Sequence, residues 1–449
     1  MGIKPVFSLL VSMSVPPMIS MLIQSLYNIV DSMFVARLSQ DALTAVSLVF
    51  PLQNLVLAVA VGTGIGLNAC VAKSLGEKNR QEADLAATQG AILTVFHIIL
   101  FILVGALGSK WFLGLFTDID SVIQMGCKYS YIVICLSGAS MFHILIEKIF
   151  QSTGNMVVPM ILQAVGAIVN IILDPILIFG LIGFPALGVT GAAIATIIGQ
   201  FVACFLAVVL YLRKDCGVRI DIKRLKWNTN MAKKIYSVAI PSCLMISMPS
   251  ILVGILNRIL FEISQTAVAV FGVYFKLQTF VYMPANGVVQ GMRPIISYNF
   301  GAKNYKRMKQ TLRNALAIVG VVMLAGTLLF LFQAKGILTL FGGDPDMMAI
   351  GVNALRIISL GFVVSTIGVV ISGAFEALGN GVYSLTVSLL RQMLIIPPLA
   401  LLFVTLMQGN LNGVWITFPI AETIASVVAL LLYKKFYRTL REKNTDESL

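Results

Sequence analysis

The chain has 449 residues, of which 58% are hydrophobic and only 11% are charged. Soluble globular domains have about 25% charged residues, so this composition excludes an ordinary soluble protein and indicates a chain that crosses a membrane several times. The net charge of +13 does not indicate a nucleic-acid partner, because no basic or aromatic-interleaved binding module accompanies it. Six scattered cysteines, without paired spacing or a histidine cluster, predict neither a disulfide framework nor a zinc site.

Twelve apolar stretches are long enough to cross about 30 Å of hydrocarbon, which takes about 20 helical residues. Polar breaks with turn chemistry separate them. The stretches lie at roughly 13–36, 44–71, 88–109, 124–147, 157–180, 188–212, 235–261, 266–292, 312–333, 348–373, 382–404 and 411–433. The sequence therefore predicts an all-α polytopic membrane protein with twelve transmembrane helices.

Lysine and arginine are concentrated in alternate loops. If the N-terminus is cytoplasmic, the inside segments hold 23 of the 32 basic residues, including eight between Arg213 and Lys234. Positively charged loops stay on the cytoplasmic side of a membrane, and this rule alone accounts for the basic 213–234 segment. We therefore expect a multi-pass protein of the cell membrane with both termini cytoplasmic.

An internal repeat runs through the chain at a single offset of 225 residues. The motif Ser39-Gln40 recurs as Ser264-Gln265, and three glycines recur as three more. The glycine pairs are Gly62 with Gly287, Gly66 with Gly291, and Gly76 with Gly301. Because each half holds six spans, an even number, both halves enter from the same side and form parallel repeats. We expect two six-helix lobes across a central cavity: residues 1–212 and 235–433, joined by a cytoplasmic basic linker at 213–234 and followed by a cytoplasmic tail at 434–449.

A polar stripe interrupts the first span, where Gln24, Asn28 and Asp31 have the three- and four-residue spacing of one helical face. The fifth span carries a similar stripe of Gln163, Asn170 and Asp174. A carboxylate inside a bilayer costs about 2.5–3.5 kcal/mol on insertion scales, so such residues usually face a cavity and have a function.

Two carboxylates near each other in a low dielectric cannot easily both stay ionised, so one of them can take up a proton near neutral pH. A Na⁺ ion bound by Asp31, Asn170 and Asp174 would serve the same purpose. The alternative is a hydrogen-bond network between helices with no transport role. The repeat argues against this alternative, because Asp31 and Asp174 fall on Leu256 and Leu399 in the second half.

Several motifs spread along the chain resemble those of the multidrug and toxic compound extrusion (MATE) family, closest to its DinF-like and MepA-like branch. The first span is rich in proline and ends in an acidic motif, and further motifs lie after the second and eighth spans, just before and within the fifth, and at the start of the sixth. They are Pro16-Pro17, Asp31-x-x-Phe-Val-Ala, Gly76-Glu-Lys-Asn79, Pro294-Ile-Ile-Ser-Tyr-Asn-Phe-Gly301-Ala-Lys303, Gly154-Asn-x3-Pro159, Asn170-Ile-Ile-Leu-Asp174-Pro175 and Gly188-Val-x-Gly191-Ala-Ala-x-Ala-Thr196.

The resemblance implies a transporter rather than an enzyme, with no catalytic residues. It implies a proton- or cation-coupling site at Asp31, Asn28, Asn170 and Asp174, and Thr196 matches a threonine of the sixth helix. Some family members carry acidic residues in the seventh and tenth helices. Here only Glu262 and Glu376 are available, near helix ends, so we do not carry a second-lobe cation site over.

Other polar residues within the spans are candidates for lining the cavity. They are Gln24, Tyr27, Gln53, Gln163, Thr196, Lys276, Gln278 and Arg391. Lys276 and Arg391 are the deeper cations of the second half, and the sequence does not say which of them neutralises Glu422. No phosphate-binding loop of the Gly-x4-Gly-Lys-Ser/Thr type is present, so ATP is not the expected energy source.

We therefore expect a secondary active antiporter that exports organic compounds or drugs, cationic and apolar, in exchange for H⁺ or Na⁺. It would need no cofactor and no nucleic acid, and it would work in membrane lipid as a monomer. One alternative is a lipid-linked saccharide flippase of the same superfamily, which would have fourteen helices and a more cationic cavity. Another is a membrane scaffold or receptor that transports nothing.

Overall fold

The computed structural model describes residues 1–214, 216–221, 226–341, 345–407 and 409–446. Within these ranges all regular secondary structure is helical, and twelve segments are long and apolar enough to cross a membrane. The predicted all-α class with twelve spans is therefore confirmed. The first half contains α1 (Val6–Ala36), α2 (Gln40–Gly76), α3 (Arg80–Gly114), α4 (Asp120–Cys135), α5 (Gly138–Ser152), α6 (Val157–Phe179) and α7 (Val189–Arg213). The second half contains α8 (Thr229–Phe261), α9 (Gln265–Gly301), α10 (Tyr305–Leu340), α11 (Pro345–Ala377), α12 (Gly381–Leu389), the π-helix η2 (Leu390–Leu394), α13 (Ile396–Leu406) and α14 (Leu411–Asp446).

Several of the motifs repeated in the sequence are helix caps. The Ser39 side chain accepts a hydrogen bond from the backbone N–H of the third residue along, and Ser264 does the same at the equivalent place. Asn79 and Asn304 cap α3 and α10 in the same way. A capping side chain satisfies a backbone donor that the helix itself leaves free, so these residues fix where α2, α3, α9 and α10 begin.

The helices extend beyond the apolar stretches from which they were predicted. The fourth span is two helices separated at Leu136–Ser137, and the eleventh is α12 and α13 joined by the π-helix. α8 begins at Thr229, inside the expected linker, and α14 continues through the expected tail to Asp446. Hydropathy finds the apolar part of a helix but not the polar turns that project from it, which accounts for these differences.

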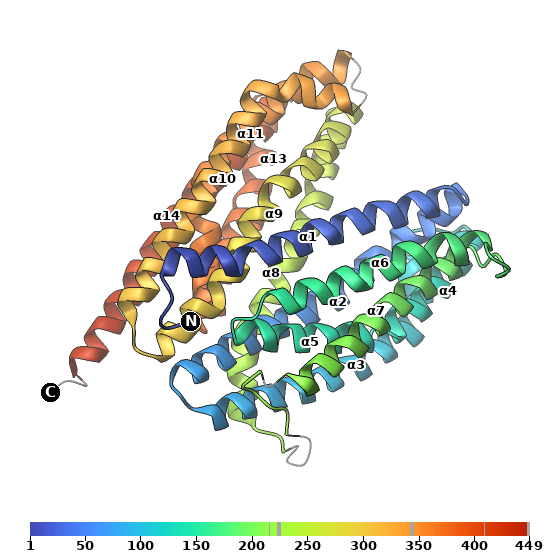
Figure 1. The fold of residues 1–449 in the computed structure, drawn as a ribbon. Helices are drawn as coiled ribbons and strands as arrows, with labels where there is room; N and C mark the ends of the chain where they lie inside the picture. The colour runs from blue at the N-terminus through green and yellow to red at the C-terminus, as the bar shows by residue number, and fades with distance from the viewer. Residues whose placement is uncertain (215, 222–225, 342–344, 408, 447–449) are drawn as a thin grey trace.

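Figure 1 shows two helical bundles that lie close together near the N- and C-termini and diverge away from them. We call the bundle of α2–α7 the first lobe, the bundle of α8–α14 the second lobe, and the end that carries both termini the terminal side. α1 runs between the lobes. Leu9, Leu10 and Met13 of α1 belong to the core of the second lobe, while the remainder of the helix runs along α6.

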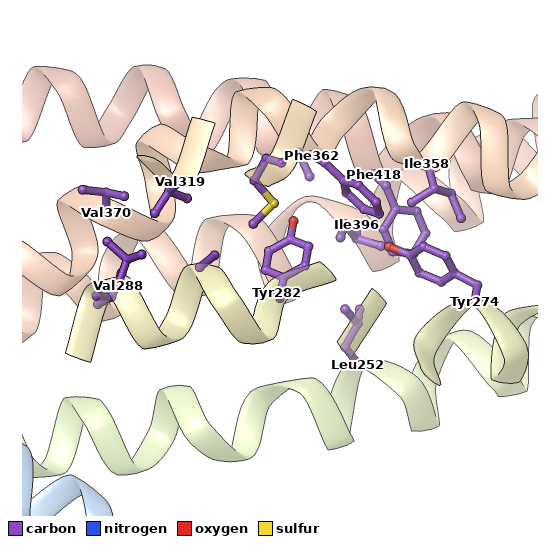
Figure 2. Packing of buried hydrophobic residues seen from close by; sticks show 14 of the residues in the cluster. Leu252, Tyr274, Tyr282, Val288, Val319, Ile358, Phe362, Val370, Ile396 and Phe418 are labelled. Atoms are coloured by element: carbon purple, nitrogen blue, oxygen red, sulfur yellow. The ribbon is translucent and has the colours of Figure 1, made fainter. Parts of the chain in front are cut away.

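The core of the second lobe is a continuous apolar cluster drawn from α8, α9, α10, α11, α13 and α14. Figure 2 shows part of it, with aromatic rings meeting edge to face at its centre. The ring of Phe362 lies 5.6 Å from that of Tyr282 and 5.4 Å from that of Phe330. Such close packing makes each lobe a stiff unit, so rearrangement is expected between the lobes rather than within them.

The repeated glycines lie where the lobes approach each other. A Cβ at Gly62 or Gly66 of α2 would run into the backbone of α8 near Ala239. A Cβ at Gly287 or Gly291 of α9 would run into α1 at the equivalent positions. Gly76 packs against Tyr298 in the same way that Gly301 packs against Lys73. The two glycines are 225 residues apart, and so are Lys73 and Tyr298. Close backbone approach therefore holds the terminal side together through a pseudo-twofold contact.

Candidate functional site

Asp31 of α1 and Asp174 of α6 are brought together where α1 packs along the first lobe. Their carboxyl groups lie close enough to interact electrostatically with each other. Asp174 is fully buried, and the Asn170 amide donates a hydrogen bond of 3.2 Å to its Oδ1 atom. The same amide lies 3.4 Å from the Thr196 hydroxyl of α7. Two carboxyls, an amide and a hydroxyl from three helices therefore form one cluster, which we call the carboxyl pair site.

Three oxygen atoms of this cluster are buried without a hydrogen-bond partner. They are Oδ1 of Asp31, Oδ2 of Asp174 and Oδ1 of Asn170. Buried acceptors in native proteins are nearly always satisfied, because leaving one unpaired costs about 1–3 kcal/mol. A shared proton or a small hard cation would satisfy these atoms, since all of the donor atoms here are oxygens.

The position of the site depends on glycines that let α6 and α7 come close. A Cβ at Gly199 of α7 would lie 2.7 Å from the Gly166 carbonyl oxygen and 3.3 Å from the Asn170 Cβ atom. The absence of a side chain at this crossing brings Thr196 within reach of Asn170. Pro175 lies inside α6 directly after Asp174, and its ring cannot donate the usual helical hydrogen bond.

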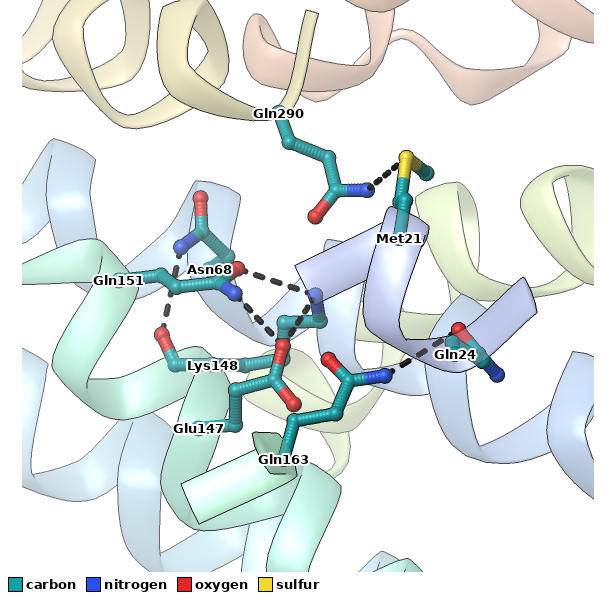
Figure 3. A network of polar contacts seen from close by, with 8 residues as sticks. All are labelled: Met21, Gln24, Asn68, Glu147, Lys148, Gln151, Gln163 and Gln290. Carbon is teal, nitrogen blue, oxygen red and sulfur yellow. Dashed lines mark hydrogen bonds and ion pairs between the residues drawn. The ribbon is translucent and has the colours of Figure 1, made fainter. Parts of the chain in front are cut away.

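The polar stripe of α1 continues along α6 toward the terminal side. The Gln163 amide donates a hydrogen bond of 3.2 Å to the Gln24 side-chain oxygen, as Figure 3 shows. The same view contains the buried cation Lys148 of α5, whose Nζ atom lies 3.0 Å from Gln151 Oε1 and 3.4 Å from Glu147 Oε1. Lys148 is therefore paired within its own helix, as expected for a charge at this depth.

Two tyrosines border the carboxyl pair site. Tyr27 and the buried Tyr129 of α4 both lie close enough to Asp31 to interact with it electrostatically. Gln53 of α2 lies 3.4 Å from the Tyr129 hydroxyl, and so joins the site through this residue. The sequence analysis did not single out Tyr129, because no polar residue stands three or four positions from it in the fourth span.

Asn28 is not part of the cluster. Its side chain is exposed and has no hydrogen-bond partner among the described residues. It shares a face of α1 with Ser25, which contacts Met283 of α9 at 3.9 Å. The helix therefore presents Asp31 to α6 and Asn28 toward the second lobe.

The second lobe contains a buried ion pair in place of the carboxyl pair. Arg391 lies in the π-helix and binds Glu422 of α14 at 2.9 Å, with side chains that are 18% and 10% exposed. The guanidinium also lies over the ring of Tyr282 at 5.6 Å, and the Tyr282 hydroxyl forms a hydrogen bond of 2.8 Å with Ser365. Gln278 of α9 lies close enough to Tyr282 to interact with it. Arg391 rather than Lys276 is thus the partner of Glu422, and Lys276 is exposed on α9.

Glu376 is the second acidic residue that the sequence placed near a helix end. It is 3% exposed, forms an ion pair with Arg293 of α9 and accepts a hydrogen bond of 2.9 Å from Ser242. Glu262 instead pairs with Arg258 one turn earlier, and both side chains are exposed. Both acids are therefore already neutralised by an arginine.

Comparison with known proteins agrees with this architecture. The family model described as MatE matches residues 16–176 and 231–402. The multidrug export protein MepA of Staphylococcus aureus (strain MSSA476) is 26% identical over 434 residues, covering 96% of this chain and 94% of that protein. A protein of Shewanella oneidensis named FAD transporter is 26% identical over 451 residues, covering 98% and 97%.

Solved structures share the fold over almost the whole chain. One is described as the outward-facing conformation of a multidrug resistance MATE family transporter, with a TM-score of 0.91, 24% identity, and coverage of 98% of this chain and 97% of that one. A transporter of the MOP superfamily from Pyrococcus furiosus gives the same values. These matches confirm the resemblance seen in the motifs. Because the family model covers more than half of the residues, the chain belongs to the MatE family, whose members are transporters and not enzymes.

Proposed function

We propose that this protein is a secondary active antiporter that exports organic compounds, cationic and apolar, in exchange for H⁺ or Na⁺. Family membership and the similarity to a named multidrug export protein support export of small molecules. The observation that supports ion coupling is the carboxyl pair site, where three buried oxygens have no partner. An ion that enters and leaves this site during the cycle would satisfy these atoms in one state and release them in the other.

The arrangement of α1 suggests how ion binding reaches the lobes. Pro16 and Pro17 lie inside α1, between the part packed in the second lobe and the part along α6. Proline weakens a helix at such a point and allows it to bend. Neutralising Asp31 would remove a buried charge that holds α1 against α6, and so shift the equilibrium between lobe orientations.

The close glycine contacts between the lobes lie on the terminal side, where the two bundles meet (Figure 1). We propose that this side is cytoplasmic, because the basic residues of alternate loops gather there. The described conformation would then be the one that opens away from the cytoplasm. The protein would act as a monomer in the cell membrane, since each chain contains both lobes.

The test is transport of a fluorescent cationic dye in proteoliposomes driven by a pH gradient alone or by a Na⁺ gradient alone. We expect one of the two gradients to drive uptake in the wild type. Asp31→Asn and Asp174→Asn should each abolish gradient-driven transport, while Asp118→Asn, an exposed acid between α3 and α4, should leave it unchanged. Undiminished gradient-driven transport in both carboxyl variants would contradict the proposal.

A further inference from the structure

The exposed face of α9 continues the face that contacts α1. On the terminal side, Gly287 packs against Met18, and Gln290 contacts Met21. Moving away from the terminal side at steps of three or four residues, the same face passes through Met283 and becomes exposed. The exposed members are Thr279, Lys276, Gly272 and Ala269. Lys276 therefore lies on the face of α9 that is directed toward the first lobe, beyond the point where the lobes part.

The opposing face of α1 behaves in the same way. Met18, Met21 and Ser25 contact α9, and the next residues on this face, Asn28 and Ser32, are exposed. Both exposed faces are polar or small. A different face of α1 is exposed and apolar, as expected for contact with lipid. It consists of Leu22, Leu26, Ile29 and Met33, each about half exposed. The polar faces of α1 and α9 are therefore expected to line a water-filled opening between the lobes.

The register of the two helices fixes the level of Lys276. The helices run antiparallel, with Met18 beside Gly287 and Ser25 beside Met283. At about 1.5 Å per residue, Lys276 stands about 10 Å beyond Met283. Continuing this antiparallel register along both helices places Lys276 opposite the part of α1 between Asn28 and Ser32, which includes Asp31.

Charges on the two walls of this opening are opposite in sign. The first lobe presents the carboxyl pair site, where Asp31 is the more exposed acid. Lys276 has no ion-pair partner within the described residues, whereas the deeper Arg391 and Arg293 are each bound to a glutamate of the second lobe. A cationic group is thus favoured on one wall and an anionic group on the other.

We infer that Lys276 binds an anionic group of the exported compound, so that the transporter accepts zwitterionic substrates that carry a carboxylate or phosphate beside their cationic part. The inference rests on the proposed export function and defines its substrate class more closely. The flexible ammonium can donate three hydrogen bonds to such a group.

The test compares rhodamine B, which has a free carboxylate, with its ethyl ester, which is only cationic. Binding is measured by fluorescence anisotropy in detergent and transport in proteoliposomes. Lys276→Gln should weaken binding of rhodamine B about tenfold, the typical effect of losing a hydrogen bond to a charged group, and leave the ester unchanged or improved. Lys276→Arg should retain rhodamine B binding.

Lys335→Gln is the matched control, because Lys335 is an exposed lysine of the same lobe that lies on an apolar outer face of α10 instead of the face directed toward the first lobe. That face of α10 carries Val321, Leu324, Leu328 and Phe332, which are 44–76% exposed. The inference would be overturned if Lys276→Gln weakened binding of both dyes equally, or if Lys335→Gln weakened rhodamine B binding as much as Lys276→Gln does. It would also be overturned if the wild type bound only the ester, although the proposed function would then stand. Lys276-dependent binding of rhodamine B without transport of either dye supports the inference and contradicts the proposed function, whereas binding of neither dye contradicts both.

Discussion

Removing the arginine of the second-lobe ion pair should destabilise the protein far more than removing both charges. In Arg391→Met, Glu422 keeps its buried position but loses its only ion-pair partner in the described structure, and its Oε2 atom already has no hydrogen bond. Breaking a buried pair in this way costs about 3–5 kcal/mol, because one charge is left without compensation. Loss of the contact with the Tyr282 ring adds about 0.5–2 kcal/mol. The unfolding equilibrium constant should therefore rise at least a hundredfold.

The double variant Arg391→Met with Glu422→Leu should recover most of this loss, because two apolar side chains of similar size fill the site without a buried charge. Reversible unfolding in mixed micelles of SDS gives the free energy of unfolding for the wild type, both single variants and the double variant. The coupling energy from this cycle should be about 2 kcal/mol or more. Additive effects of the two single substitutions would show that the charges do not stabilise each other, and so refute the argument.

Three further predictions concern the first lobe and the N-terminal segment. Gly199→Val should separate α6 from α7, lower the stability by about 1–3 kcal/mol and abolish gradient-driven transport, measured by thermal denaturation and dye uptake; unchanged transport would contradict the role of this crossing. Tyr129→Phe leaves the Gln53 amide without its acceptor and should cost about 1 kcal/mol in the free energy of unfolding, with a changed pH dependence of transport; an identical pH profile would separate Tyr129 from the carboxyl pair site. Arg307→Gln removes the donor to the backbone carbonyl oxygens of Met1 and Lys4, so amide exchange in residues 2–9 should accelerate in mass spectrometry, and equal protection would show that this tether is not holding the segment.

Helical spacing was enough to predict the carboxyl pair site but not its whole composition. Asp31 and Asp174 were identified because each stands in a polar stripe within an apolar span, and the structure places them together. Asn28 belongs to the same stripe in sequence, yet it is exposed on another face of α1. A stripe of three polar residues spans enough of a helix to meet two different neighbours, and spacing alone does not say where one neighbour ends.

The sequence did not predict which charged residues of distant helices form ion pairs. Arg391 and Glu422 come from α12–α13 and α14, and the π-helix at Leu390–Leu394 changes the direction in which Arg391 points. Nothing in the local sequence distinguishes this turn from ordinary helix. The fold was more accessible, because hydropathy, loop charge and an unbroken repeat are all properties that do not depend on side-chain orientation.

The pseudo-twofold glycine contacts have a consequence for how such a protein can change during evolution. The parts that must match between the halves, Gly62 with Gly287 and Gly66 with Gly291, lie where the backbones of α2 and α8 and of α9 and α1 approach most closely. The charged residues that distinguish the halves, the carboxyl pair site in one and Lys276 in the other, lie away from these contacts. Substitutions at the charged residues can therefore accumulate without disturbing these close contacts, whereas a substitution at one glycine leaves its repeat partner unmatched.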